Sequence, residues 1–186
     1  MKRIIPYAHD LIREIVQPGD TVIDATCGNG HDTLFLSKLV EGEGKVHSFD
    51  IQDKALANTS ILLKENHVTN VELHLDGHEN VDRYVVEEGS VRAAIFNLGY
   101  LPGEDHSIIT KPETTIEAIK KIQPLLVKGG RIVLVIYHGH EGGQEEKESV
   151  ISYCTQLDQK LYDVVRYEFI NQINRPPFVI AIEKKK

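Results

Sequence analysis

Short apolar runs alternate along this chain with longer segments whose apolar residues recur at helical spacing. The runs predicted to form strands cover residues 21–25, 45–51, 71–75, 91–96, 130–137, 161–170 and 177–183. The segments predicted to form helices cover residues 7–16, 31–41, 53–66, 79–88, 112–127 and 144–159. This alternation is typical of the α/β class with a doubly wound, mostly parallel sheet.

Turn-forming residues separate these elements. They precede four of the predicted strands, at Pro18-Gly19, at Gly42 with Gly44, at Gly89-Ser90 and at Gly129-Gly130. The last two predicted strands are joined by a short link around residues 171–176. Because parallel neighbours need a long crossover, we expect these two strands to form an antiparallel hairpin.

Size and composition are those of one compact enzyme domain. The chain has 186 residues, of which 41% are hydrophobic, and we expect a single domain over residues 1–186. No apolar run approaches the roughly 20 residues that a membrane-spanning helix needs, so we expect no membrane partner. The two cysteines form no C-x-x-C pair, which favours free thiols in the cytoplasm and argues against a zinc site.

The formal net charge of −7 argues against a protein that holds nucleic acid through a broad basic surface. A small local patch of basic residues is still compatible with that net charge. Lys2 and Arg3, Arg175 and the terminal run 184–186 are candidates to gather on one side of the fold. The alternative for the terminal lysines is a solvated tail.

The segment 22–30, with the sequence VIDATCGNG, is an apolar run that leads into a turn of small residues. Asp50 follows Gly30 by twenty residues, at the end of the next apolar run. Glycines allow the backbone to approach a ligand, and a carboxylate at the next strand end accepts hydrogen bonds from a ribose. The segment therefore indicates an adenosine-containing cofactor, although a purely structural turn is the alternative.

Two classes of cofactor share this pattern. A dinucleotide site has G-x-G-x-x-G, whereas the third position here is Thr33. The segment agrees better with D-x-G-x-G-x-G, the loop of S-adenosylmethionine enzymes, with Thr26 in place of the first glycine. We therefore favour S-adenosylmethionine over NAD.

Ligands of doubly wound sheets bind beyond the carboxyl ends of the strands. Polar and glycine residues gather after five of the predicted strands, at 27–32, at 50–52, at 76–78, at 97–102 and at 138–143. Asn97-Leu98-Gly99-Tyr100 has part of the character of the N-P-P-Y motif of amino-group methyltransferases, with Leu98-Gly99 in place of the two prolines. In that motif the Asn side chain and the next carbonyl accept hydrogen bonds from the target amine. Tyr100 either stacks on a planar base or caps the sheet.

Histidine and cysteine residues near these strand ends allow several roles. No further ligands accompany His138 and His140 at metal-binding spacing, so we expect no metal ion there. The roles that remain open for a histidine in this loop are a proton relay and a hydrogen bond within the loop. We interpret Cys27 as a small loop residue and not as a thiolate nucleophile. We interpret Cys154 as a residue of the hydrophobic core. His9 and Asp10 either close over the cofactor or lie at the surface.

Five segments together resemble a known family: 8–11 (AHDL), 24–33 (DATCGNGHDT), 97–102 (NLGYLP), 138–143 (HGHEGG) and 174–177 (NRPP). They are similar to the small bacterial class I S-adenosylmethionine-dependent methyltransferases once labelled as rRNA methylases. Within that family the chain is most similar to enzymes that methylate 5-aminomethyl-2-thiouridine at the tRNA wobble position. The resemblance implies the strand order 3-2-1-4-5-7-6, a homodimer and a tRNA anticodon loop as partner.

The resemblance also implies roles for individual residues. It assigns the methionine end of the cofactor to Cys27, Asn29 and Asp32, the ribose to Asp50 and Gln52, and the adenine side to Gly77 and His78. The catalytic candidates are Asn97, Tyr100 and His140. The alternatives that remain open are a methyltransferase of another RNA, a methyltransferase of a small amine metabolite, and a cofactor-binding module without catalysis.

Overall fold

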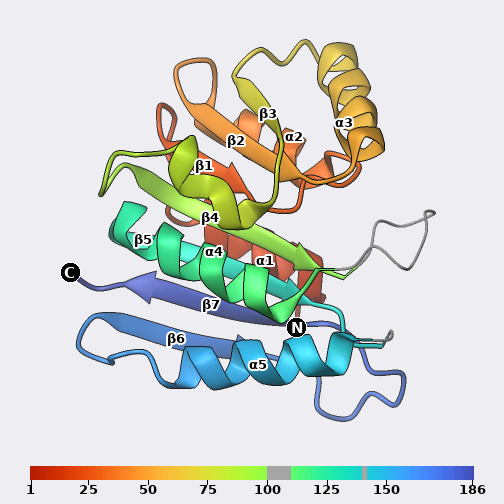
Figure 1. Cartoon of the computed structure of the whole chain (residues 1–186), viewed down its shortest axis with the longest axis vertical. Coiled ribbons are helices and arrows are strands. Elements are labelled where there is room, and N and C mark those ends of the chain that lie inside the picture. The colour runs from red at the N-terminus through yellow and green to blue at the C-terminus, as the bar shows by residue number, and fades with distance from the viewer. Residues whose placement is uncertain (100–109, 140–141) are drawn as a thin grey trace.

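The computed structural model describes residues 1–99, 110–139 and 142–186. Seven strands form one sheet in the order β3-β2-β1-β4-β5-β7-β6, as the family resemblance implies (Figure 1). The pairs β3–β2, β2–β1, β1–β4 and β4–β5 are parallel, whereas β7 is antiparallel to both β5 and β6. The predicted fold class and the terminal hairpin are therefore confirmed.

The strands are β1 (Thr21–Asp24), β2 (Lys45–Asp50), β3 (Val71–Leu75), β4 (Val91–Leu98), β5 (Leu126–Ile136), β6 (Tyr162–Tyr167) and β7 (Phe178–Lys184). The α-helices are α1 (Ile4–Arg13), α2 (His31–Val40), α3 (Asp53–Glu65), α4 (Pro112–Leu125) and α5 (Gly143–Thr155). A short 3₁₀ helix, η1 (His78–Arg83), stands where the sequence predicted a helix over 79–88. None of the described helices has the length and apolar character needed to cross a bilayer.

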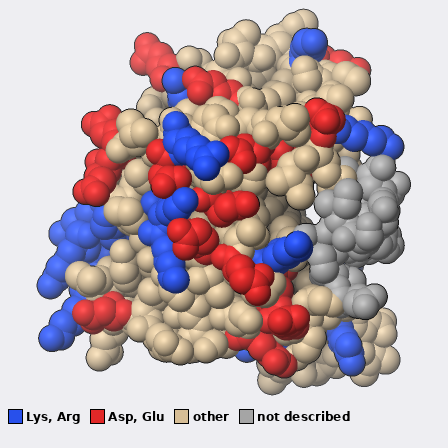
Figure 2. Space-filling view, viewed as in Figure 1, with Lys and Arg blue, Asp and Glu red and all other residues tan. Residues whose placement is uncertain are grey.

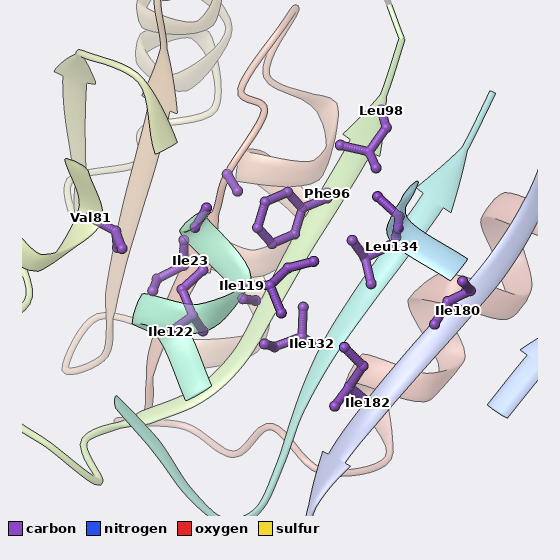
Figure 3. Close-up of a cluster of buried hydrophobic side chains, with 14 of the residues drawn as sticks. Ile23, Val81, Phe96, Leu98, Ile119, Ile122, Ile132, Leu134, Ile180 and Ile182 are labelled. Atoms are coloured by element: carbon purple, nitrogen blue, oxygen red, sulfur yellow. The ribbon is translucent and has the colours of Figure 1, made fainter. Parts of the chain in front are cut away.

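Two hydrophobic layers enclose the sheet. On one side, buried residues of α1 and α2 pack against β1, β2, β4 and β5; on the other, η1, α4 and α5 cover the sheet (Figure 1). The apolar residues of α4 recur three or four positions apart, so Ile119 and Ile122 both face β4 and β5 (Figure 3). Because both faces are covered, residues 93–96 of β4 and 132–136 of β5 are all apolar, as expected of buried parallel strands.

Several predicted boundaries were wrong; for example, β6 ends at Tyr167 and α5 at Thr155, whereas the predictions reached residues 170 and 159. The first helix begins at Ile4 and ends at Arg13, whereas the prediction was 7–16, because Ile4 belongs to the buried face of the helix. The fifth strand begins at Leu126, so Gly129 and Gly130 lie inside it and do not precede it. The pairing with β4 shifts register between Val91 and Ala93, which marks a bulge. Gly129 has φ +74°, a conformation that favours glycine.

Candidate active site

A cavity of about 310 Å³ opens at the carboxyl ends of the parallel strands, where sequence reasoning placed the site. Of the predicted site residues, Asp50, Gln52, Gly77, His78 and Asn97 line it. The other lining residues are Ala25, Thr26, Gly28, Phe49, Ile51, Asp76, Glu79, Gly99, Thr110, Lys111 and Thr114. Segments from five separate parts of the chain therefore meet in one hollow.

The turn after β1 needs its glycines for conformation and for space. Gly28 has φ +54° and Gly30 has φ +83°, both in the left-handed region. Gly30 is also the residue before the first turn of α2, and a Cβ atom there would lie 2.7 Å from Oγ1 of Thr59. The Thr59 hydroxyl donates to the carbonyl of Gly28 over 3.1 Å. Thr59, from α3, therefore supports the glycine loop from beneath, a contact that no sequence signal indicated.

Asp50 holds the same loop from the end of β2. Its Oδ2 accepts a hydrogen bond of 2.9 Å from the backbone N–H of Gly28, and its Oδ1 accepts one of 3.0 Å from Gln52. Carboxylate oxygens have further lone pairs, so Asp50 retains acceptor capacity toward the cavity that it lines. The bond from Gly28 therefore ties the glycine loop to the end of β2.

A buried polar group lies under the loop. Asp24 is fully buried; its Oδ2 accepts a hydrogen bond of 2.6 Å from the Thr33 hydroxyl, which lies 3.0 Å from Ser48 Oγ. Thr33 thus has a structural role at the position where a dinucleotide site has its third glycine. Burial raises the pKa of Asp24 to about 7, and the neighbouring Asp32 carboxylate adds to the effect.

Asp32 and Asn97 connect the glycine loop to the end of β4. Asn97 Nδ2 donates to Asp32 Oδ2, and His9 Nε2 lies 2.7 Å from Asp32 Oδ1. A carboxylate only accepts, so the amide N–H₂ must face Asp32, and the Asn97 Oδ1 is left as the acceptor. His9 therefore belongs to the site, whereas Asp10 pairs with Lys2 and Arg13 at the surface.

Thr26 and Thr110 fix the backbone of the segment after β4. The N–H of Asn97 donates to Thr26 Oγ1 over 2.6 Å. Thr26, which replaces the first glycine of the D-x-G-x-G-x-G motif, therefore has a specific hydrogen-bond partner. The N–H of Gly99 donates to Thr110 Oγ1, and that hydroxyl donates to Glu146 Oε2 over 2.7 Å. Burial raises the pKa of Glu146. Neither Thr110 nor Glu146 carried a signal in the sequence, because their partners lie far away along the chain.

His78 and Gly77, which follow β3, line one side of the cavity. His78 is buried; its Nδ1 lies 2.9 Å from the carbonyl of Ala25 and therefore donates to it. Its Nε2 is then an acceptor, buried without a hydrogen-bond partner among the described residues. Burial lowers the pKa of His78, which keeps the ring neutral. A Cβ at Gly77 would overlap the Glu79 carboxylate, so a larger residue there would require the Glu79 side chain to move.

Cys27 and Asn29 lie in the loop but are not among the lining residues. The Cys27 thiol is buried and donates to Thr59 Oγ1 over 3.1 Å, and burial raises its pKa to about 12. Such a thiol is a poor nucleophile, consistent with its interpretation as a small loop residue. Asn29 Oδ1 accepts a bond of 3.0 Å from Asn58. Cys154 is buried in the core, on α5.

Tyr100 and His140, two of the catalytic candidates, lie outside the described residues. His138, at the end of β5, is described and is buried. Its Nε2 donates to the carbonyl of Pro176 over 3.1 Å, which ties the end of β5 to the segment before β7. This contact agrees with a loop hydrogen bond for His138.

The basic residues that were candidates for a local patch do not all lie on one side of the fold. Lys184 donates to the carbonyls of Pro124 and Leu126, so the end of the antiparallel strand β7 lies at the start of β5, away from the cavity. Lys2 lies at the other end of the β6–β7 pair, since its carbonyl accepts from the Tyr167 hydroxyl at the end of β6. The terminal lysine run is therefore separate from the site.

The strand order, the glycine loop after β1 and the acidic residue after β2 together define a class I S-adenosylmethionine-dependent methyltransferase fold. The chain belongs to the family named "Putative rRNA methylase", whose sequence profile matches residues 46–183.

Three relatives support this assignment. The "tRNA (mnm(5)s(2)U34)-methyltransferase, chloroplastic" of Arabidopsis thaliana is 38% identical over 195 residues, which cover 99% of this chain and 70% of that protein. The "putative rRNA-methylase" from Clostridium thermocellum is 51% identical, with a TM-score of 0.96 over 99% of this chain and 98% of that one. A methyltransferase structure from Streptococcus mutans "in complex with SAH" is 45% identical, with a TM-score of 0.91 over 99% of both chains.

The raised pKa of Asp24 generates a prediction for stability. Between about pH 4 and pH 7 the folded protein keeps a proton on Asp24 that the unfolded chain has lost, so this group lowers the free energy of unfolding as the pH rises. We expect the stability of Asp24→Asn relative to the wild type to increase from pH 5 to pH 8 in urea unfolding.

An exposed carboxylate provides the matched control: Asp53→Asn should show a stability difference that is constant over the same range. A difference for Asp24→Asn that stays constant or falls with pH contradicts the assignment.

Proposed function

We propose that this protein transfers a methyl group from S-adenosylmethionine to the aminomethyl nitrogen of 5-aminomethyl-2-thiouridine at the wobble position of tRNA. The observation that carries the proposal is the bond between Asn97 and Asp32, which leaves the Asn97 Oδ1 as an acceptor at the cavity that Asp50 also lines. A relative of 38% identity is named for methylation at this tRNA position.

The residues present fit the cofactor. Asp50 offers carboxylate lone pairs for the ribose hydroxyls, with Gln52 beside it. The buried Nε2 of His78 needs a hydrogen-bond donor, and the exocyclic amine of adenine is one. Gly77 lines the same part of the cavity. When bound, S-adenosylmethionine supplies an electrophilic methyl group on a positively charged sulfur.

For the methionine end we propose the first turn of α2 and the loop before it. Asp32 is the acceptor for the cofactor ammonium, and free N–H groups at the helix start meet the carboxylate. Cys27 and Asn29 contribute here through the loop backbone, because the thiol of Cys27 and the amide of Asn29 are engaged with Thr59 and Asn58.

At the amine end, Asn97 Oδ1 accepts a hydrogen bond from the neutral target amine and turns the nitrogen lone pair toward the methyl group. The new N–C bond forms as the C–S bond breaks, and the nitrogen then loses a proton. Tyr100 and His140 remain our candidates for stacking on the base and for relaying that proton.

An acidic protein suits a target in a single-stranded loop, where the base swings into a pocket without opening a duplex. On the face shown in Figure 2, acidic and basic side chains are interspersed. We propose that Lys111, which lines the cavity, provides local phosphate contacts together with the exposed Arg3 and Arg175.

The ribose role of Asp50 is testable by cofactor binding alone. Asp50→Asn keeps one acceptor but loses the charge and the second one, so we expect the Kd for S-adenosylmethionine to rise at least tenfold, about 1.4 kcal/mol, by isothermal titration calorimetry. Asp53→Asn, exposed and outside the cavity lining, should bind as the wild type does. Equal affinity for Asp50→Asn and the wild type would remove this residue from the proposed site.

The substrate is tested with purified protein and methyl-labelled S-adenosylmethionine. We expect label in tRNA that carries 5-aminomethyl-2-thiouridine, recovered as the methylaminomethyl nucleoside by mass spectrometry. We expect none in tRNA with an unmodified wobble uridine or in an amine metabolite extract. Label at another nucleoside or in the extract would instead support another RNA or a small amine as substrate.

Asn97→Ala separates catalysis from cofactor binding in the same assay. We expect the rate of tRNA methylation to fall about 100-fold or more, while the Kd for S-adenosylmethionine changes little, because the amide orients the amine. Asn66→Ala, an exposed change on the end of α3, is the matched control. An Asn97→Ala protein with the wild-type rate contradicts the role of this residue.

We further propose a cytoplasmic homodimer. The two buried cysteines are free, which suits a reducing compartment. Ile170 and Ile173, in the segment between β6 and β7, are 93% and 92% exposed, and Val165 of the edge strand β6 is half exposed. Exposed apolar side chains of this size beside an unpaired strand edge favour association with a second copy.

Light scattering after size-exclusion chromatography tests the dimer. We expect the wild type to have twice the 21.0 kDa chain mass and the double variant Ile170→Lys, Ile173→Lys to have the single mass. Ile61→Lys, an exposed apolar position on α3, should leave the mass unchanged. A wild-type protein of single mass at micromolar concentration contradicts the homodimer.

A further inference from the structure

A second cluster of titratable side chains lies on β2 and β3, outside the residues that line the cavity. His47 of β2 pairs with Glu72 of β3, and His74 lies two residues further along β3, so the three side chains project from the same face of the sheet. His47 Nδ1 lies 3.1 Å from His74 Nε2 and 3.5 Å from Glu72 Oε2. One ligand-type atom from each residue falls within 4.8 Å of the other two.

The two separations from His47 Nδ1 match those between the ligands of a tetrahedral metal ion. Bonds of about 2.0–2.1 Å place neighbouring ligand atoms about 3.3 Å apart, and the two distances from His47 Nδ1 lie on either side of that value. Without an ion, one of the two facing imidazole nitrogens carries the proton of their hydrogen bond. A change of tautomer moves that proton to the other ring nitrogen and frees both facing atoms as ligands.

The neutral histidines suit a metal ion, whereas the positive charge of Lys45 opposes one. Burial lowers the pKa of His47 to about 4, and burial also lowers the pKa of His74, so both rings are neutral at pH 7, as metal ligands must be. The hydrogen bond from Lys45 lowers the pKa of Glu72. Lys45 contacts the other carboxylate oxygen, Oε1, at 2.8 Å, so Oε2 remains directed to His47.

Neighbouring side chains fix the orientation of His74. Its ring packs on Tyr84 with 4.2 Å between centroids, and on Phe49 with 4.7 Å. The Tyr84 hydroxyl donates to Asp76 over 2.9 Å. The Glu72 side chain is 48% exposed, which leaves an open side where water can complete a coordination shell.

We propose that His47 Nδ1, Glu72 Oε2 and His74 Nε2 bind a divalent transition-metal ion of the zinc class, with water as the fourth ligand. The ion links the edge strand β3 to β2 and stabilises the folded state, because the three ligands converge only when the strands are paired. The proposal is independent of the substrate proposed above.

Titration of metal-free protein with ZnCl₂ tests the site. We expect one zinc ion per chain with a micromolar or lower Kd, and a rise of about 5 °C or more in Tm at 100-fold excess over Kd. CoCl₂ should give the visible absorption bands of tetrahedral cobalt.

Variants identify the ligands. Glu72→Gln and His74→Ala should each weaken zinc binding at least tenfold and abolish the cobalt bands, with circular dichroism to verify folding. His67→Asn, an exposed histidine at the end of α3, should bind as the wild type does. Lys45→Gln should bind zinc more tightly, because it removes a positive charge and frees the carboxylate.

Absence of zinc binding up to millimolar concentration would overturn the proposal. So would zinc binding that is unchanged in both Glu72→Gln and His74→Ala, since the ion would then be held elsewhere.

Discussion

The hydrogen bond that Asn97 donates to Asp32 joins the start of α2 to the end of β4 within the site. Asp32 belongs to the first turn of α2, next to the glycine loop, whereas Asn97 lies 65 residues further along, near the end of β4. Because a carboxylate accepts and cannot donate, this one contact decides which side of the amide faces the cavity. His9 occupies the other oxygen of Asp32, so the N-terminal helix also depends on this carboxylate.

Buried hydroxyl and carboxyl groups hold the loops of the site in place. Thr33 bonds to Asp24 under the glycine loop, and Thr110 bonds to Glu146 behind the segment after β4. An unpaired polar group in such surroundings is expensive, so each pair allows few arrangements of the backbone above it. The loops are thus positioned by polar contacts, while the sheet beneath them is positioned by apolar packing.

Much of the fold was accessible from the pattern of residues. A parallel strand covered on both faces must be apolar throughout, and the helices beside it must carry an apolar stripe, so the two periods alternate visibly along the chain. The boundary of β5 was missed because Gly129 and Gly130 are typical of turns. They lie in a bulge of the strand, a feature that depends on the register with β4.

By itself the sequence determined the class of fold, the place of the site at the strand ends, and residues such as Asp50, Gly77, His78 and Asn97 that line the cavity. These follow from local rules, since each lies at the end of an apolar run or within three residues after it. Only the tertiary structure decided the partners: Thr59 under Gly30, Glu146 behind Thr110, and the cluster of His47, Glu72 and His74. The physical reason is that hydrogen bonds and metal ligands require distances of a few ångströms between residues remote in the chain, and strand order and register alone set those distances.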